Sequence, residues 1–197
     1  MILLTHNVYW FQGHPSRWGA ERVAEQPDVF DPLMEIYASA APGLVCLQEV
    51  HRPDLAAEAA RRLGLPAWIH APGGLRPDYG CAAMGPEGAA LADFTREGAK
   101  PLHDRVHVRA NVPSNGTAWE IAVVHLPSNR YAGSPEEGEA ARMAELERVL
   151  ATPPTPEVVL GDMNSLPDSG PCRMMENRGY VDAATANGRD PGPGRRI

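Results

Sequence analysis

Five polar residues, in four widely separated parts of the sequence, each follow a short apolar run. They are Asn7, Glu49, His125, Asp162 and Asn164. Carboxylate and amide oxygens are ligands that Mg²⁺ and Mn²⁺ accept, and an imidazole can donate a hydrogen bond to charge that develops on a phosphoryl group. If these side chains lie together, they can support metal-assisted attack of water on a phosphoester.

Side-chain alternation along strands predicts that these residues share one site. Residues two apart in a strand face the same side of the sheet. The polar residues therefore continue four columns, at positions 3, 5 and 7; 45, 47 and 49; 121, 123 and 125; and 158, 160, 162 and 164. Because ligand sites in α/β sheets favour the carboxyl ends of strands, we expect these strand ends to line one mouth.

Each residue type suggests a role in such a site. We expect Glu49 to bind the metal ion and Asn7 to coordinate it or support it. Asp162 would orient or deprotonate the attacking water, Asn164 would hold a nonbridging phosphate oxygen, and His125 would stabilise charge on phosphorus. Taken singly, such residues are often turn formers or structural hydrogen-bonding groups. Their combination, each at the end of an apolar column, favours a function.

The elements that must position these residues mix strands with helices. Strands are predicted at 2–8, 44–50, 67–70, 79–84, 105–112, 119–126, 158–161 and 180–182, and helices at 28–41, 53–63, 135–151 and 170–178. Asn115-Gly116 predicts a hairpin, and S-P-E-E at 134–137 predicts a helix start with a capping box. This order excludes a purely parallel doubly wound sheet and favours an α/β or α+β fold with mixed sheets.

The composition limits the class of protein. A chain of 197 residues fits a single domain, here 1–197, with enough length for a sizeable core. No apolar run approaches the roughly 20 residues of a membrane span, and the N-terminus has no signal-peptide pattern. Three scattered cysteines argue against a disulfide framework and a cysteine zinc site. They indicate a reducing compartment, so we expect a cytoplasmic protein.

The net charge bears on the substrate. At −7, the chain is not suited to holding a long phosphate backbone by charge alone. A bound divalent cation would still supply positive charge for a phosphate group. We therefore expect a small phosphodiester or phosphomonoester rather than long duplex DNA. The sequence indicates no obligate protein partner.

The motifs around these residues resemble those of the endonuclease/exonuclease/phosphatase superfamily of DNase I-like, metal-dependent phosphoesterases. The similar segments are T-H-N-V at 5–8, C-L-Q-E-V at 46–50, V-V-H-L at 123–126, V-L-G-D-M-N at 159–164 and L-P-D-S-G-P at 166–171. The resemblance implies a four-layer α/β/β/α sandwich of two mixed sheets with outer helices. It also implies a Mg²⁺ or Mn²⁺ cofactor, with the five residues in roles like those given above.

Four weaker candidates for substrate binding complete the set, and the resemblance implies the first two. In the nuclease branch the histidine is paired with an acidic residue, for which Asp78 is a candidate, and Arg105 is a candidate phosphate-binding arginine. Trp10 belongs to an aromatic surface loop at 9–20 that could stack on a base or pack against a lipid or sugar, or could simply anchor itself. Asn129, which follows V-V-H-L closely, is a further candidate.

One departure from the family pattern leaves two hypotheses open. Family members end with an R-I-D-Y-type strand and an S-D-H motif that carries a second aspartate and an essential histidine. This sequence reaches G-R-R-I at 194–197 and contains no S-D-H. We expect a phosphoester hydrolase whose domain is C-terminally incomplete here and lacks its last strands. The alternative is a protein that works without that histidine or has become a fold-retaining binding or scaffold protein.

Overall fold

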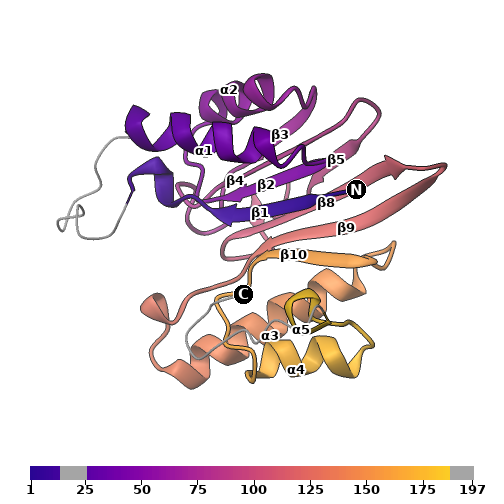
Figure 1. The fold of residues 1–197 in the computed structure, drawn as a ribbon. Coiled ribbons are helices and arrows are strands. Elements are labelled where there is room, and N and C mark those ends of the chain that lie inside the picture. The colour runs from indigo at the N-terminus through magenta and orange to yellow at the C-terminus, as the bar shows by residue number, and fades with distance from the viewer. Residues whose placement is uncertain (14–25, 187–197) are drawn as a thin grey trace.

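Two sheets of four strands each form the centre of the molecule (Figure 1). The computed structural model describes residues 1–13 and 26–186. The first sheet has the strand order β1 (Leu3–Asn7), β2 (Leu44–Gln48), β4 (Cys81–Gly85) and β3 (Ala67–Ala71). The second has the order β10 (Val158–Asp162), β9 (Thr117–His125), β8 (Val106–Ser114) and β5 (Ala90–Asp93). A separate two-stranded ribbon pairs β6 (Arg96–Glu97) with β7 (Lys100–Pro101).

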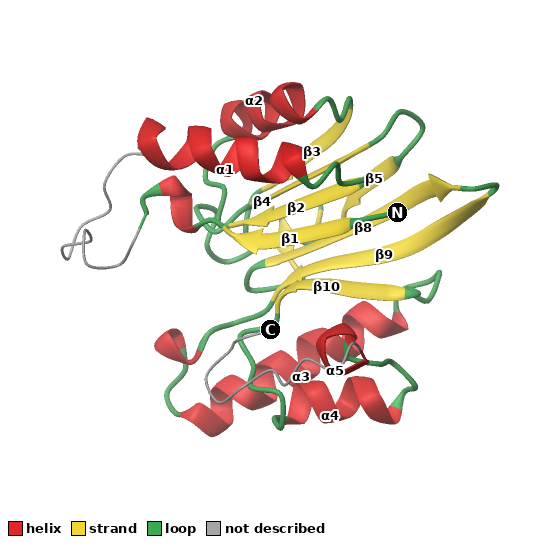
Figure 2. Cartoon of the chain, viewed as in Figure 1, coloured by secondary structure: helices red, strands yellow, loops and turns green. Residues whose placement is uncertain are grey.

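Helices cover the two outer faces, as Figure 2 shows. Over the first sheet lie α1 (Pro27–Ser39) and α2 (Pro53–Leu63). Over the second lie α3 (Pro135–Ala151) and α4 (Gly170–Asn177), followed by the short α5 (Ala183–Ala186). Two 3-10 turns, η1 (Tyr9–Phe11) and η3 (Asn129–Tyr131), follow β1 and β9. The four-layer α/β/β/α sandwich expected from the sequence is confirmed. No helix in the described part of the chain is long and apolar enough to cross a membrane.

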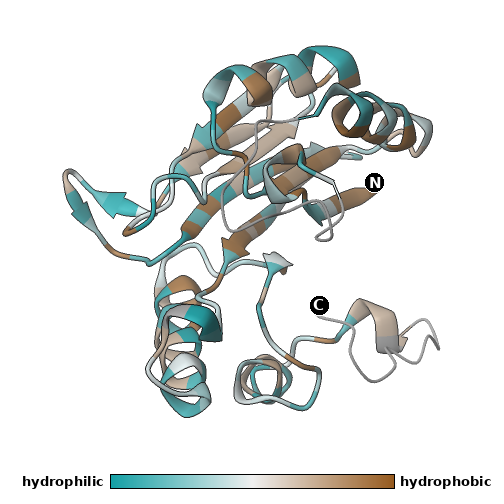
Figure 3. Ribbon diagram, turned by 90° about the vertical axis from the view of Figure 1, so that its left-hand side faces the viewer, coloured by the Kyte–Doolittle hydropathy of each residue, from teal (hydrophilic) through white to brown (hydrophobic). Residues whose placement is uncertain are grey.

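Three apolar layers hold the sandwich together. The layer between the sheets includes Cys46, Val108 and Val123. A second layer packs α1 and α2 against the first sheet, and a third packs α3 and α4 against the second sheet. Apolar residues accordingly concentrate on the strands in Figure 3. Because each sheet is buried on both faces, its central strands read as continuous apolar runs.

The two parallel strand pairs end on the same side of the sandwich. β1 runs parallel to β2, which places Asn7 beside Gln48, and β10 runs parallel to β9, which places Asp162 beside His125. β1 also contacts β10 across the sandwich. The antiparallel β8–β9 hairpin turns at Asn115-Gly116, as predicted. The strand ends that carry the candidate residues therefore meet at one edge.

Several elements differ from the sequence prediction, and β6, β7 and α5 were not predicted at all. Residues 180–182 form no strand, because Gly179 (φ +88°) ends α4 and the Tyr180 N–H donates to the Met175 carbonyl instead of a sheet ladder. β5 was missed, since its alanine-rich sequence has little strand propensity. The surface loop predicted at 9–20 begins as a buried turn, in which Trp10 is 2% and Phe11 0% exposed. Residues 14–20 of that loop lie outside the described residues.

The predicted start of α3 forms with one change. The Ser134 hydroxyl accepts a hydrogen bond from the Glu137 N–H at 3.2 Å, as a capping serine does. The Glu137 carboxylate accepts from the Gly133 N–H at 3.0 Å, one residue before the cap. Glu137 therefore still stabilises the start of the helix, but it accepts from the Gly133 N–H and not from the Ser134 N–H.

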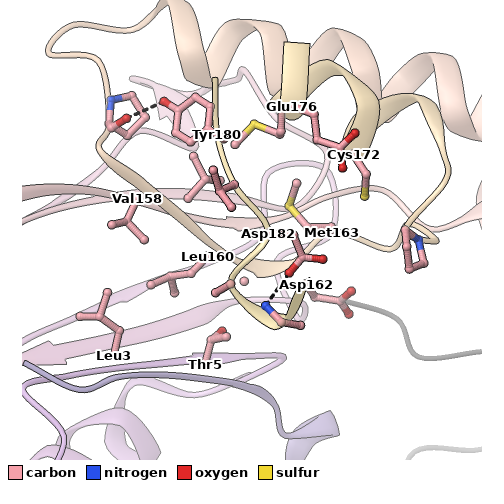
Figure 4. A pocket seen from close by; sticks show the side chains of 18 of the residues that line it. Leu3, Thr5, Val158, Leu160, Asp162, Met163, Cys172, Glu176, Tyr180 and Asp182 are labelled. Atoms are coloured by element: carbon pink, nitrogen blue, oxygen red, sulfur yellow. Dashed lines mark hydrogen bonds between the residues drawn. The ribbon is translucent and has the colours of Figure 1, made fainter. Parts of the chain in front are cut away.

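A hollow of about 1480 Å³ lies along the outer edges of β1 and β10 (Figure 4). Leu3, Val158 and Leu160 line its sheet side, and Tyr180 lies on the α4 side. Within the described residues, neither β1 nor β10 has a strand partner at this outer edge. The layer between the sheets is therefore partly open here, and β10 is only half-buried along its length. The G-R-R-I segment at 194–197 lies outside the described residues.

Gly161 offers a test of the packing between β9 and β10. Its φ is +133°, and a Cβ at this position would lie 1.9 Å from the Val124 carbonyl oxygen. Gly161→Ala should lower the free energy of unfolding by about 4 kcal/mol or more in urea denaturation, because neither backbone can move away cheaply. Gly64→Ala is the control, with φ +66° but no atom within 4 Å, and should cost about 1 kcal/mol. Equal losses in the two variants would contradict the predicted clash.

Candidate active site

A cleft of about 700 Å³ opens where β1, β2, β9 and β10 end. Its walls include all five residues that the sequence brings forward first: Asn7, Glu49, His125, Asp162 and Asn164. Of these five, the larger hollow of Figure 4 includes Asn7 and Asp162 alone. We therefore place the chemistry in the smaller cleft.

The Asn7 side chain joins the two carboxylates. Its Nδ2 donates to Glu49 Oε1 at 3.1 Å and to Asp162 Oδ2 at 2.8 Å. The Tyr9 N–H donates to Asn7 Oδ1 at 3.0 Å, and this contact determines which way the amide points, because a flipped amide would set its oxygen against two acids. Asn7 therefore supports the two carboxylates, and its predicted contact with a metal ion stays a prediction.

Glu49 reaches the cleft through a left-handed backbone turn. In β2, Val45 and Leu47 pack toward the helices, whereas Cys46 packs between the sheets. The other three columns face the layer between the sheets, so simple alternation would aim Glu49 away from them. A φ of +60° after the end of β2 turns its side chain into the cleft. The alternation argument was wrong for this residue, although the residue itself lies in the site.

His125 and Asp162 are register neighbours on β9 and β10. His125 Nε2 lies 3.8 Å from Asp162 Oδ2 and 3.8 Å from Glu49 Oε1, which is too long for a hydrogen bond. Burial lowers the pKa of His125 to about 4, Asp162 opposes this shift, and Arg105 adds to it. The imidazole is therefore neutral near pH 7. Its Nδ1 is buried and has no hydrogen-bond partner among the described residues.

Asn164 ties the end of β10 to the end of β9. Its Nδ2 donates to the Leu126 carbonyl at 2.8 Å, and its backbone N–H donates to Asp162 Oδ1 at 2.9 Å. Its φ of +47° is a conformation that asparagine tolerates better than most residues. The residue lines the cleft, and the predicted contact with a phosphate oxygen stays a prediction.

Two of the weaker candidates, Arg105 and Asn129, line the same cleft. The Arg105 guanidinium carbon lies 3.5 Å from the centre of the Tyr79 ring. Asn129 Oδ1 accepts a hydrogen bond from Arg142 Nη1 at 2.6 Å. Both candidates can therefore approach a bound substrate.

The other two, Asp78 and Trp10, are not brought to the cleft. Asp78 is exposed and is not part of the cleft wall, whereas His125 lies beside Glu49 and Asp162. Trp10 is buried, and its Nε1 donates to the Asp78 carbonyl at 2.7 Å. Its ring packs inside the molecule, with its centre 4.8 Å from the centre of the Tyr79 ring, and is not positioned to stack on a substrate. Trp18, in the same aromatic segment, lies outside the described residues.

Tyr79 and Arg142 also line the cleft and were missed by the sequence reading. The Tyr79 ring lies 6.3 Å from the His125 ring. Arg142 is buried, and its Nη1 donates to the Pro127 carbonyl at 3.1 Å. One signal for it existed, since Arg142 shares the i, i+4, i+7 spacing of Leu146 and Val149 on the buried face of α3. Tyr79 had no comparable signal.

The donor set suits a partly hydrated hard cation. Mg²⁺ keeps several waters and is commonly held by one or two carboxylates, which Glu49 and Asp162 can supply. Among the described residues, no group of three His, Cys, Asp or Glu side chains is arranged to hold a metal ion. Glu49 and Asp162 are therefore the residues of this cleft that could hold a divalent cation.

Comparison with known proteins agrees with this geometry. The model of the Endonuclease/Exonuclease/phosphatase family matches residues 4–197. Similar solved structures include the human Nocturnin catalytic domain, at 19% identity and a TM-score of 0.61 over 86% of this chain and 70% of that chain. A beta toxin variant from Staphylococcus aureus with bound magnesium ions has 14% identity and a TM-score of 0.62 over 91% of this chain and 70% of that chain. Humanized D. rerio TDP2 has 17% identity and a TM-score of 0.57 over 92% of this chain and 72% of that chain. No curated protein matches the sequence. At these identities, the structural likeness shows the fold alone.

The buried imidazole makes stability depend on pH. Because burial lowers the pKa of His125 from 6.5 to about 4, the unfolded chain binds a proton there more readily than the folded protein. This contribution is complete above the unfolded pKa and is lost as the pH falls toward the folded one, by about 3 kcal/mol. Urea unfolding at about pH 7 and about pH 4.5 measures it. His125→Gln should lose less stability than the wild type over this range, and an equal loss would contradict a buried neutral His125.

Proposed function

The chain belongs to the endonuclease/exonuclease/phosphatase family, and we propose that it is a divalent-metal-dependent hydrolase of phosphoester bonds. The observation that carries the proposal is the meeting of Asn7, Glu49 and Asp162 in one cleft, with neutral His125 beside both acids. Two neighbouring carboxylates repel each other, and a divalent cation bound between them would offset that repulsion. The arrangement is therefore understood if the cleft binds a metal ion.

The reaction we propose is in-line attack of water on phosphorus. A bound Mg²⁺ or Mn²⁺, held by Glu49 with Asp162 next to it, would polarise the phosphoryl group. Asp162 accepts hydrogen bonds from the Asn7 amide and the Asn164 N–H, so its carboxylate is already oriented to position the water and take its proton. The bond from phosphorus to the ester oxygen breaks as the water oxygen bonds, and the leaving oxygen takes a proton from solvent water, while neutral His125 would donate an N–H to the phosphoryl oxygen that gains charge. The Asn164 amide is the further donor to that group.

The charges of the cleft favour a small substrate. Arg105, Arg130 and Arg142 line it, but so do Glu136 and Glu139. Such a mixed wall lacks the continuous positive surface that holds a duplex backbone. A volume of about 700 Å³ is in the range of small-molecule sites. We therefore propose a small phosphodiester or phosphomonoester over long duplex DNA.

The proposal includes a cytoplasmic location and no obligate protein partner. All three cysteines are free thiols, and Cys46 and Cys81 are buried in the sandwich. Burial raises the pKa of both thiols, Cys81 to about 12, so they act as small apolar residues. Free, inert thiols support a reducing compartment.

Hydrolysis of bis(p-nitrophenyl) phosphate tests the proposed activity. We expect turnover with Mg²⁺ or Mn²⁺ that EDTA abolishes. Glu49→Ala and Asp162→Ala should each lower kcat/KM by about a thousandfold, because each removes charge stabilisation from the reacting centre. Asp54→Ala, at an exposed acid on α2, is the matched control and should keep wild-type activity.

Undiminished turnover in both site variants would remove the assignment of Glu49 and Asp162. No turnover in the wild type, together with retained Mg²⁺ binding by calorimetry, would favour the alternative of a fold-retaining binding or scaffold protein. The two outcomes are distinct because metal binding and hydrolysis are measured separately.

A further inference from the structure

A buried carboxylate on α3 holds the segment that leads into β8. Glu145 is 5% exposed, and its Oε1 accepts a hydrogen bond from the Asp104 N–H at 2.6 Å. Its Oε2 lies 3.5 Å from Nδ1 of His103, which is also buried. Burying an acid is costly unless hydrogen bonds and charges compensate for the lost water. Glu145 is not part of the cleft wall, so the proposed chemistry does not explain its burial.

The segment held by this carboxylate carries Arg105 into the cleft. Arg105 lies over the Tyr79 ring at 3.5 Å, and its Nε lies 3.4 Å from Asp104 Oδ2. On the other side of the segment, the N–H groups of Gly74 and Leu75 donate to the carbonyls of Arg105 and Asp104 at 2.7 and 2.9 Å. Hydrogen bonds therefore hold the segment on both sides, from α3 and from the loop that leads to Tyr79.

The packing leaves the segment little freedom. A Cβ on Gly74 would lie 1.7 Å from the His103 carbonyl oxygen, so the two backbones are already in close contact. Arg105 lines the same cleft as His125 and Asp162. A shift of the segment would therefore move a positive charge relative to the catalytic residues.

We infer that Glu145 is a positioning residue for phosphate binding: it holds the segment at 103–105 so that Arg105, backed by Tyr79, presents its guanidinium to an anionic phosphoryl group. The inference rests on the proposed function for the nature of the substrate. Glu145 acts through the reach of its side chain and its acceptor oxygen, since the Asp104 N–H requires only an oxygen at that place.

Two substitutions of Glu145 distinguish the effect of its side-chain length from that of its negative charge. Glu145→Asp keeps the charge but withdraws the carboxylate by one methylene. We expect it to raise KM for the phosphodiester and Kd for inorganic phosphate about tenfold, with kcat changed about twofold at most. Glu145→Gln keeps the length of the side chain and an acceptor oxygen, so its KM for the phosphodiester and its Kd for inorganic phosphate should equal those of the wild type. Glu147→Asp makes the same change at an exposed position of α3 and is the matched control.

A double-mutant cycle with Arg105→Ala tests whether Glu145 acts through Arg105. Arg105→Ala alone should weaken phosphate binding, and Glu145→Asp should add nothing in that background. A residue that merely supported the fold would weaken binding equally in both backgrounds. If the aspartate variant does not fold, as judged by thermal unfolding, Glu145→Asn replaces it and shortens the side chain without leaving a buried charge.

Phosphate binding is measured by calorimetry on the full chain, so the inference does not require turnover. An unchanged Kd in Glu145→Asp, additive effects with Arg105→Ala, or loss of binding in Glu145→Gln would each overturn the positioning role. A wild-type protein that binds no phosphate would overturn it as well. Intact, Glu145-dependent phosphate binding without hydrolysis would overturn the proposed function alone.

Discussion

One side-chain amide joins the two halves of the sandwich where the cleft opens. Asn7 ends β1 and Glu49 follows β2 in the first sheet, and Asp162 ends β10 in the second, yet both acids accept hydrogen bonds from the Asn7 Nδ2. Two carboxylates so close repel each other, and a donated N–H offsets only part of that repulsion. The remaining demand for positive charge supports the metal site proposed at this edge of the fold, where the parallel pairing of the strands brings the three residues together.

The site is held in backbone conformations that cost energy. Glu49 and Asn164 have φ values of +60° and +47°, and the η1 turn has positive φ throughout. Such residues persist only where the surroundings hold them firmly. Here the Trp10 N–H donates to the Glu49 carbonyl at 2.9 Å, and the buried rings of Trp10 and Phe11 anchor the turn. Trp10 and Phe11 are therefore understood as the support of Glu49.

Helix α3 supports the cleft from outside. Arg142 and Glu145, one turn apart on its buried face, reach two different loops. Arg142 binds the Pro127 carbonyl and the Asn129 amide oxygen, next to the strand that carries His125. Glu145 holds the segment before Arg105. Loops fixed by buried ionic side chains on a rigid helix keep cleft residues within the small tolerances that catalysis requires.

The sequence by itself determined most of the strands and helices, the hairpin at Asn115-Gly116 and the residues that end the apolar columns, because periodicity and turn chemistry are local. It could not determine where a side chain points once its strand has ended. Glu49 enters the cleft only through its left-handed turn, and the Asn7 amide faces the acids only because the Tyr9 N–H takes its oxygen. Trp10 turns inward for a similar reason, because its partners are far along the chain. The contacts of the Asn7 amide with the two acids, of Trp10 with the Asp78 carbonyl and of the Trp10 N–H with the Glu49 carbonyl join distant segments, which only the tertiary structure brings together.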